Sequence, residues 1–425
     1  MTPDHTLPDH TQPDDALPDD TLADDTSTGP LNPRAPRLAG QISADGGAAR
    51  RVKPTSGFPK SDPADDDVGA RTPLYGALDL GTNNCRLLVA RPSRRGFVVV
   101  DSFSRIIRLG EGLTTSGRLS DAAMARTIQA LRICAGKLRK HNVARKRLVA
   151  TQACRMAENG ETFIKTVKRD TGLDLEVLSQ ESEAQLAVAG CATLLDRDCD
   201  MVLVFDIGGG SSELVWLDMC GRGGEPGLQP IGARGPLSEA RMAAWTSLPV
   251  GVVTLAEQFN GRDVTAQSFE DMVAAVAEML VPFEAQHGIG RRLASGNIHF
   301  LGTSGTVTTV AGIRLNLPRY DRRLVDGCWL HVDEVRTVTQ NLLAQSYEQR
   351  CAEPCIGRDR ADLVLAGCAI LEALLRLWPT ERLRVADRGL REGILSTLMA
   401  EDGFPRSSRR RARRRGRSKA GNGCG

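Results

Sequence analysis

The stretch that most constrains the fold runs from Met201 to Leu214, where an apolar segment enters a glycine-rich turn. The apolar run Val202 to Phe205 ends at a carboxylate, Asp206. Three glycines and two serines follow, and then a second carboxylate, Glu213, opens another apolar run. Glycine has no Cβ, so the backbone N–H groups of such a turn can close around an anion. The pattern predicts a β-hairpin with a phosphate-binding tip, and a turn without a ligand is the alternative.

The same order of elements occurs a second time, earlier in the chain. Leu74 to Asp79 predicts a strand, Gly81 to Asn84 a polar turn, and Leu87 to Val89 the next strand. A third segment, Ile298 to Val307, predicts a strand that leads through a Gly/Ser/Thr loop into a helix. Two acidic hairpins and one strand–loop–helix are what a duplicated, two-lobed phosphate site requires.

This ordered set resembles the exopolyphosphatase and guanosine pentaphosphate phosphohydrolase family (Ppx/GppA), within the actin and hexokinase-like superfamily. Besides the three loops, the resemblance rests on Ala150 to Arg155, Ser179 to Leu186, Leu248 to Gly251 and Asp387 to Gly393. It implies an α/β fold of two ribonuclease-H-like lobes, as in actin-like ATPases. It also implies an active site in the cleft between the lobes.

Charge and composition divide the chain into four expected parts. Residues 1–30 carry eight Asp and no Lys or Arg, whereas residues 406–425 carry eight Arg, one Lys and no acid. We therefore expect a disordered acidic tail over residues 1–70 and a disordered basic tail over 405–425. Between them we expect a first lobe over 71–199 and a second over 200–404, ending in a closing helix.

The resemblance also implies roles for individual residues. Glu183 is the expected general base, and Arg155 is expected to offset substrate charge, although a surface arginine is the alternative. Gln180 and Ser182 stand where the family more often has Gly and Glu, which leaves the key acid in place. Mg²⁺, with Mn²⁺ as the alternative, is expected on Asp206 and Glu213. The expected phosphate-binding residues are Asp79, Gly81, Thr82, Asn83, Gly208, Gly209, Gly210, Ser211, Ser212, Gly302, Thr303, Ser304, Gly305 and Thr306.

The implied activity is attack of water on the terminal phosphate of inorganic polyphosphate, on the 5′-γ-phosphate of guanosine pentaphosphate (pppGpp), or on both. A small-molecule kinase of the same superfamily is the second hypothesis. A non-catalytic module that binds polyphosphate or a guanosine penta- or tetraphosphate is the third. The segments Thr151 to Arg155 and Glu183-Ala184 favour the hydrolase. Since His287, His299 and His331 each lack a following Asp, the short, two-domain form of the family is expected.

Cysteine use and hydropathy indicate the cellular setting. Eleven scattered cysteines, an odd number, favour free thiols in a reducing cytoplasm over a disulfide framework. No signal-peptide pattern and no apolar run long enough to span a bilayer is present, so no membrane partner is expected. The basic tail could contact RNA or another polyanion non-specifically, since it lacks aromatic residues that stack on bases. A homodimer is one alternative assembly.

Overall fold

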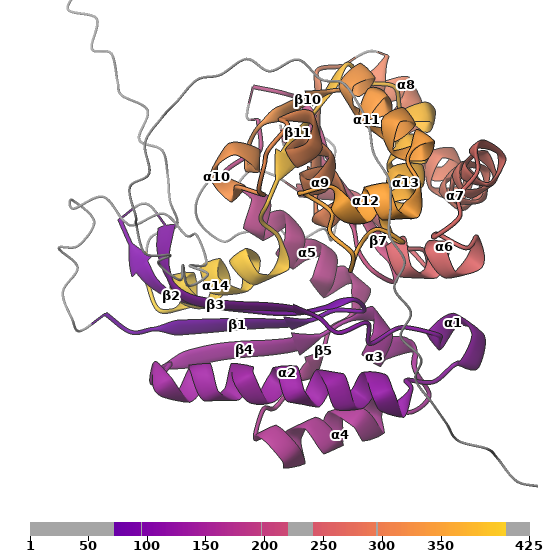
Figure 1. The fold of residues 1–425 in the computed structure, drawn as a ribbon. Helices are drawn as coiled ribbons and strands as arrows, with labels where there is room; N and C mark the ends of the chain where they lie inside the picture. The colour runs from indigo at the N-terminus through magenta and orange to yellow at the C-terminus, as the bar shows by residue number, and fades with distance from the viewer. Residues whose placement is uncertain (1–71, 95, 197, 220–240, 295, 405–425) are drawn as a thin grey trace, which may run out of the picture. The chain divides into compact units, whose positions relative to one another are not determined.

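The computed structural model describes residues 72–404, except for residues 95, 197, 220–240 and 295 (Figure 1). The two predicted tails, 1–70 and 405–425, lie outside the described residues. The Gly/Pro-rich stretch 221–236, whose composition predicts a surface loop, also lies outside them. No helix in the described ranges is both long and apolar enough to cross a membrane.

The first sheet is mixed and has five strands in the order β3-β2-β1-β4-β5. The strands β1, β2 and β3 pair antiparallel, and β1, β4 and β5 pair in parallel. Four helices belong to this first lobe, and Ser120 caps the longest of them by accepting a hydrogen bond from the Ala123 N–H. The elements are β1 (Tyr75–Leu80), β2 (Asn84–Ser93), β3 (Gly96–Ile106), α1 (Leu113–Ser116), α2 (Asp121–Lys140), β4 (Arg145–Ala150), α3 (Gln152–Met156), α4 (Gly160–Thr171) and β5 (Glu176–Val177).

The second sheet repeats this topology and adds one strand. Its order is β10-β11-β9-β6-β7-β8, with β6, β7 and β8 antiparallel and β6, β9 and β11 parallel. The elements of this second lobe are β6 (Met201–Ile207), β7 (Ser212–Asp218), β8 (Arg241–Leu248), α6 (Val252–Gln258), α7 (Ala266–His287), α8 (Ile289–Leu293), β9 (Ile298–Thr303), α9 (Gly305–Arg314), α10 (Arg322–Val325), β10 (Trp329–His331), α11 (Val332–Ala344), α12 (Tyr347–Ala352), α13 (Val364–Leu377) and β11 (Arg382–Ala386). The duplicated order confirms the predicted α/β fold with two mixed sheets.

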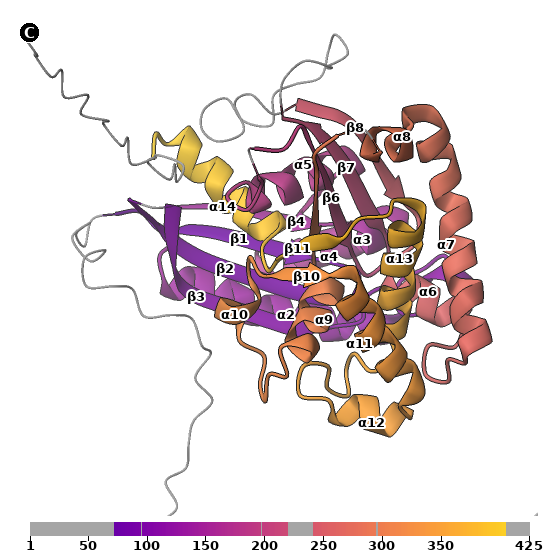
Figure 2. The same cartoon turned by 90° about the horizontal axis from the view of Figure 1, so that it is seen from above.

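In each sheet, apolar side chains at alternate positions along a strand pack against the helices that cover one face of that sheet. Leu203 and Phe205 of β6 face the large core formed with α7, α11 and α13, which Figure 2 shows gathered along one side of the second sheet. Leu78 and Leu80 of β1 face a smaller core formed with α2 and α4. Because side chains alternate along a strand, Asp79 and Asp206 point to the opposite sides of their sheets.

Two helices fill the space between those opposite sides: α5 (Gln180–Cys191) and α14 (Leu390–Glu401). The first follows β5 yet packs on Val202 and Val204 of the second sheet, whereas α14 packs on Tyr75 and Ala77 of the first. Figure 1 shows them side by side between the sheets. A Cβ at Gly190 would lie 2.0 Å from the Gly389 carbonyl oxygen, so glycine permits this close crossing. Each of these helices therefore packs on the sheet of the other half of the chain. The domain boundary near residue 200 stays a prediction.

Candidate active site

Polar side chains form a row across four neighbouring strands of the second sheet. Asp206 of β6 stands opposite Glu213 of β7, and Glu213 stands opposite Ser247 of β8. On the other side of β6, Asp206 is level with Thr303 of β9. Paired residues share a face of a sheet, so all four side chains lie on the side that α5 covers.

Glu213 is held in place by hydroxyl groups. The Ser211 Oγ donates to its Oε1 at 2.6 Å, and the Ser247 Oγ donates to the same oxygen at 2.9 Å. Only 3% of Glu213 is exposed. Burial raises the pKa of this carboxyl, and the two serine hydrogen bonds act against the rise.

Glu183 enters the same region from the first turn of α5. Ser179 caps that helix by accepting a hydrogen bond from the Ser182 N–H. The Arg155 Nη1 donates to the Glu183 Oε2 at 3.2 Å and to the Leu178 carbonyl at 2.7 Å, while its Nη2 donates to the Gln152 Oε1 at 2.7 Å. The guanidinium therefore fixes the position of Glu183 as well as adding positive charge.

The first hairpin turns through a buried loop. The Gly81 N–H donates to the Asn84 carbonyl, and both Thr82 and Asn83 are 5% exposed. Asn83 Oδ1 is buried without a hydrogen-bond partner among the described residues, which leaves an acceptor unsatisfied at the loop. Asp79 stands opposite Arg86 across the hairpin. Burial raises the pKa of Asp79, and the charges of Arg86 and Arg391 oppose this effect.

The two glycine-containing loops touch each other across the lobes. A Cβ on Gly209 would lie 3.0 Å from the Thr82 Cβ, and one on Gly210 would lie 2.8 Å from the Thr82 Oγ1. A Cβ on Gly251 would lie 2.5 Å from the Gly209 carbonyl carbon, so Gly251 allows the start of α6 to support the loop. Larger residues at Gly209 or Gly210 would force the two loops apart, and a larger residue at Gly251 would push α6 away from the second loop.

The third predicted loop lies beside Asp206 at the end of β9. Ser304 has φ 90° and ψ −177°, a backbone conformation that is favourable essentially for glycine only. The Ser304 Oγ is buried and lacks a partner in the described part of the chain. The Thr303 Oγ1 donates to the Arg388 carbonyl. Gly305 starts α9, which directs the free N–H groups of a helix start toward this region.

Packing explains the identity of Gly302 and Thr306 in this loop. A Cβ on Gly302 would lie 2.6 Å from the Phe205 ring, and the Thr306 Oγ1 would lie 2.4 Å from a Cβ on Gly367 of α13. The Thr306 side chain therefore faces α13, and only its backbone N–H belongs to the helix start. Ser212, in the second hairpin, donates through its Oγ to the Val250 carbonyl at 2.7 Å, which fixes the hairpin to the segment before α6.

Four carboxylates influence one another at this place. Burial raises the pKa of Asp206 to about 7, and the charges of Glu213 and Asp79 add to the rise. Burial also raises the pKa of Glu183 well above its ordinary value, again with Glu213 and Asp79 contributing. Acidic groups gathered in this way bind a cation or share protons.

The carboxylates of the site fit a Mg²⁺ ion that keeps several of its water ligands. The described ranges contain no group of three or more His, Cys, Asp or Glu side chains arranged as a metal site. Mg²⁺ commonly takes only one or two carboxylates and completes its shell with water and substrate phosphate. Asp206, which is partly exposed beside Glu213, meets that requirement.

Some residues at the site were not predicted. Arg86 and Ser247 are cross-strand neighbours of Asp79 and Glu213, and only the strand register reveals them. Arg388 and Glu392 form structural ion pairs, Arg388–Asp326 at 2.6 Å and Arg322–Glu392 at 2.9 Å. The charge of Arg391 acts on both Glu392 and Asp79.

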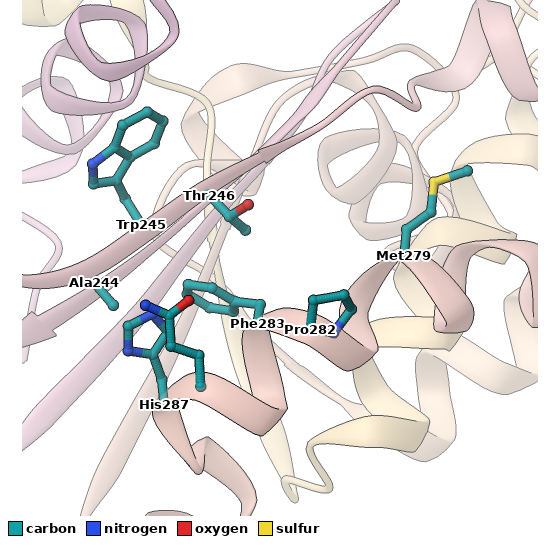
Figure 3. Close-up of a pocket in the computed structure, with 8 residues that line it drawn as sticks. Ala244, Trp245, Thr246, Met279, Pro282, Phe283 and His287 are labelled. Atoms are coloured by element: carbon teal, nitrogen blue, oxygen red, sulfur yellow. The ribbon is translucent and has the colours of Figure 1, made fainter.

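A separate pocket of about 320 Å³ lies between β8 and α7 (Figure 3). Figure 3 shows Trp245 and Thr246 on the strand, with Phe283 and His287 on the helix. None of the predicted site residues lines it, so it is distinct from the carboxylate cluster.

Comparison with known proteins agrees with this geometry. The Ppx/GppA phosphatase family matches residues 88–402. A guanosine-5'-triphosphate,3'-diphosphate pyrophosphatase from Vibrio vulnificus is 30% identical over 332 residues, which cover 78% of this chain and 60% of that protein.

Solved structures show the same fold. A Ppx/GppA family member from Aquifex aeolicus is 27% identical with a TM-score of 0.61, over 78% of this chain and 99% of that one. An exopolyphosphatase from Cytophaga hutchinsonii is 23% identical with a TM-score of 0.66, over 79% of this chain and 100% of that one. With two mixed sheets, two touching glycine loops and a family match over most of its length, the chain belongs to the Ppx/GppA phosphatase family.

Proposed function

We propose that the protein is a Mg²⁺-dependent hydrolase that releases the terminal phosphate of polyphosphate, of pppGpp, or of both. The observation that carries this proposal is the gathering of Asp79, Glu183, Asp206 and Glu213 beside two glycine loops in contact. Phosphoryl transfer depends mainly on positioning and charge neutralisation. The glycine loops can position a phosphate with backbone N–H groups, and a cation held by the carboxylates would neutralise its charge.

Glu183 is the residue best suited to take a proton from water. Burial raises its pKa, which brings a carboxylate toward the range where a general base works well near neutral pH. Arg155 holds the carboxylate by its Oε2 and so limits its orientation. Removal of either group should slow the chemical step more than it weakens substrate binding.

Asp206 and Glu213 are the residues that would hold the metal ion. When bound there, Mg²⁺ would neutralise charge on the phosphate oxygens. The serine hydroxyls on Glu213 keep its second oxygen, Oε2, available for another partner. The raised pKa of Asp206 supports this assignment, because a nearby cation would stabilise its ionised form.

A cluster of arginines supports a polyanionic substrate. Burial lowers the pKa values of Arg360 and Arg391, and the charge of Arg86 lowers both further. A bound anion with several negative charges would stabilise the charged forms of these neighbouring arginines. Polyphosphate and the pyrophosphate groups of pppGpp both meet that description.

The relatives divide between the two substrates. The curated relative from Vibrio is named for the guanosine compound, and the structure from Cytophaga is named an exopolyphosphatase. This chain spans 60% of the length of the Vibrio protein, so that protein's activity enters here only as a proposal.

The test is a side-by-side measurement of kcat/KM for long-chain polyphosphate and pppGpp, with Mg²⁺, with Mn²⁺ and with EDTA. We expect metal-dependent phosphate release from at least one substrate. ATP-dependent transfer to an acceptor without release would support the kinase alternative. Tight binding of both compounds without turnover would support a binding module and contradict the proposal.

A further inference from the structure

Two polar contacts join the lobes next to the phosphate loops. Arg108, just after β3, forms a two-point ion pair with Asp362, with its Nη1 and Nη2 at 2.9 and 3.0 Å from the two carboxylate oxygens. Four residues later, the Gly112 N–H donates to the Glu257 Oε1 of α6 at 2.8 Å. We call these two contacts the latch. Both connect residues that the sequence separates by more than a hundred positions.

On the first lobe, the latch segment is attached directly to the first phosphate loop. The N–H groups of Ile107 and Arg108 donate to the Asn83 carbonyl, and the Gly110 N–H donates to the Thr82 carbonyl. A Cβ on Gly110 would lie 2.3 Å from the Thr82 Cγ2, so the two segments are in close contact. A movement of Arg108 would therefore move the loop.

The segment itself is held in an unusual backbone conformation. Arg108 has φ 47°, the left-handed region that non-glycine residues seldom adopt. Arg126 of α2 stabilises it by donating its Nε to the Ile107 carbonyl at 3.0 Å and its Nη2 to the Arg108 carbonyl at 3.3 Å. The conformation aims the Arg108 side chain at the second lobe.

On the second lobe, the latch acceptors are fixed as well. The buried Arg350 donates to the carbonyls of Ala361 at 3.4 Å and Arg262 at 2.6 Å, which ties the segment before Asp362 to the segment that follows α6. A Cβ on Gly261 would lie 2.2 Å from the Asp362 carbonyl oxygen. Asp362 thus has little freedom to follow a moving partner.

Glu257 belongs to the helix that supports the second phosphate loop. The first turn of α6 donates from the Val252 and Val253 N–H groups to the carbonyls of Gly208 and Gly209. A continuous set of contacts therefore runs from the Thr82–Asn83 loop through the latch and α6 to the Gly208–Gly209 loop.

We propose that the latch sets the alignment of the two phosphate loops, and that Arg108 and Asp362 are positioning residues for the reaction. Loss of the latch would lower the fraction of molecules with aligned loops, and the apparent dissociation constant rises as that fraction falls. A bound polyphosphate contacts both loops and restores the alignment, so the chemical step itself should be preserved. This activity argument rests on the function proposed above.

The first experiment needs no substrate. Hydrogen–deuterium exchange is measured in the full-length wild type and in Arg108→Ala, Asp362→Asn and the double variant. We expect the amides of Ile107, Arg108 and Gly110 to exchange about five-fold faster in each single variant than in the wild type. The double variant should exchange no faster than the single variants. Additive effects, or exchange equal to wild type, would overturn the latch.

The second experiment uses phosphate release. We expect each single variant to raise KM about five-fold, which corresponds to about 1 kcal/mol, while kcat stays within about two-fold of wild type. Arg108→Lys should recover part of the loss because it keeps the charge. A fall in kcat with KM unchanged would contradict a positioning role.

Arg147→Ala is the matched control. Arg147 forms a similar two-point ion pair with Glu176, with both distances 3.0 Å, but that pair lies wholly within the first sheet. It should alter neither the exchange near Asn83 nor KM. If no phosphate substrate is turned over, the proposed function fails while the exchange experiment still decides the latch. If turnover is normal and exchange is unaffected, only the latch fails.

Discussion

Replacement of Asp206 by asparagine should stabilise the metal-free protein above neutral pH. Burial raises the pKa of Asp206 from 3.8 to about 7, and the charges of Glu213 and Asp79 act in the same direction. The folded protein therefore keeps this proton at pH values where the unfolded chain has lost it. The stability that results is fully present below about pH 4 and is lost as the pH rises to about 7.

The size of the effect follows from the pKa difference. From 3.8 to 7 the free energy of unfolding falls by about 4 kcal/mol, at 1.36 kcal/mol per pKa unit. Because the side chain is partly exposed, solvent screens part of this, and we expect Asp206→Asn to gain about 2 kcal/mol at pH 8. The gain should shrink to less than half at pH 5, where the wild-type carboxyl is still mostly protonated.

The assay is urea unfolding of both proteins in EDTA at pH 5 and pH 8. Saturating Mg²⁺ at pH 8 should cancel the difference, because only the wild type gains from the ion. Asp101→Asn is the control of opposite sign: although burial opposes it, hydrogen bonds from Lys137 and His141 lower the pKa of Asp101, so this variant should lose stability. An Asp206→Asn protein less stable than wild type at pH 8 would refute the reasoning.

Two further substitutions test the loops. Gly251→Ala should destabilise the fold by about 2 kcal/mol or more, since its Cβ would lie 2.5 Å from the Gly209 backbone, and thermal unfolding measures this; an unchanged Tm would show that α6 moves away from the second loop at little cost. Ser304→Gly should relieve a backbone strain of roughly 1–3 kcal/mol and raise Tm, yet lower kcat/KM if the hydroxyl contacts phosphate; a lower Tm would contradict the strain.

The elements that carry the site could be predicted because their signals are local. A short stretch of sequence is enough to predict each of three units: the hairpins at Asp79 and Asp206 and the strand–loop–helix at Ile298. The structure contains all three. The helix caps at Ser120 and Ser179 are equally local, because serine is favoured at the position before a helix. The family match supports the same elements as an ordered set.

The contacts that assemble the site could not be predicted in this way. Arg155 was expected to face substrate, and its observed partner, Glu183, depends on how α3 meets α5. The touching of Thr82 and Gly210, and the pairing of Arg108 with Asp362, depend on the placement of two lobes that no local pattern specifies. The strain at Ser304 is likewise invisible in a Gly/Ser/Thr sequence.

The roles of Glu183 as general base and of Asp206 and Glu213 as metal ligands are predictions. The position of Glu183 beside Glu213 and Arg155 is consistent with a general base. Asp206 and Glu213 offer carboxylate oxygens as metal ligands, and a metal titration of the wild type and of Asp206→Asn tests this role.

The central claim is that water, activated at Glu183, attacks the terminal phosphorus. A single turnover of polyphosphate or pppGpp in ¹⁸O-labelled water tests it directly, with mass spectrometry of the released phosphate and of the shortened product. Attack of water on the terminal phosphorus predicts one ¹⁸O in the released phosphate and none in the shortened product, with the rate of labelling lowered about 10²–10⁴-fold in Glu183→Gln. Label in the shortened product, or an undiminished rate in Glu183→Gln, would contradict it.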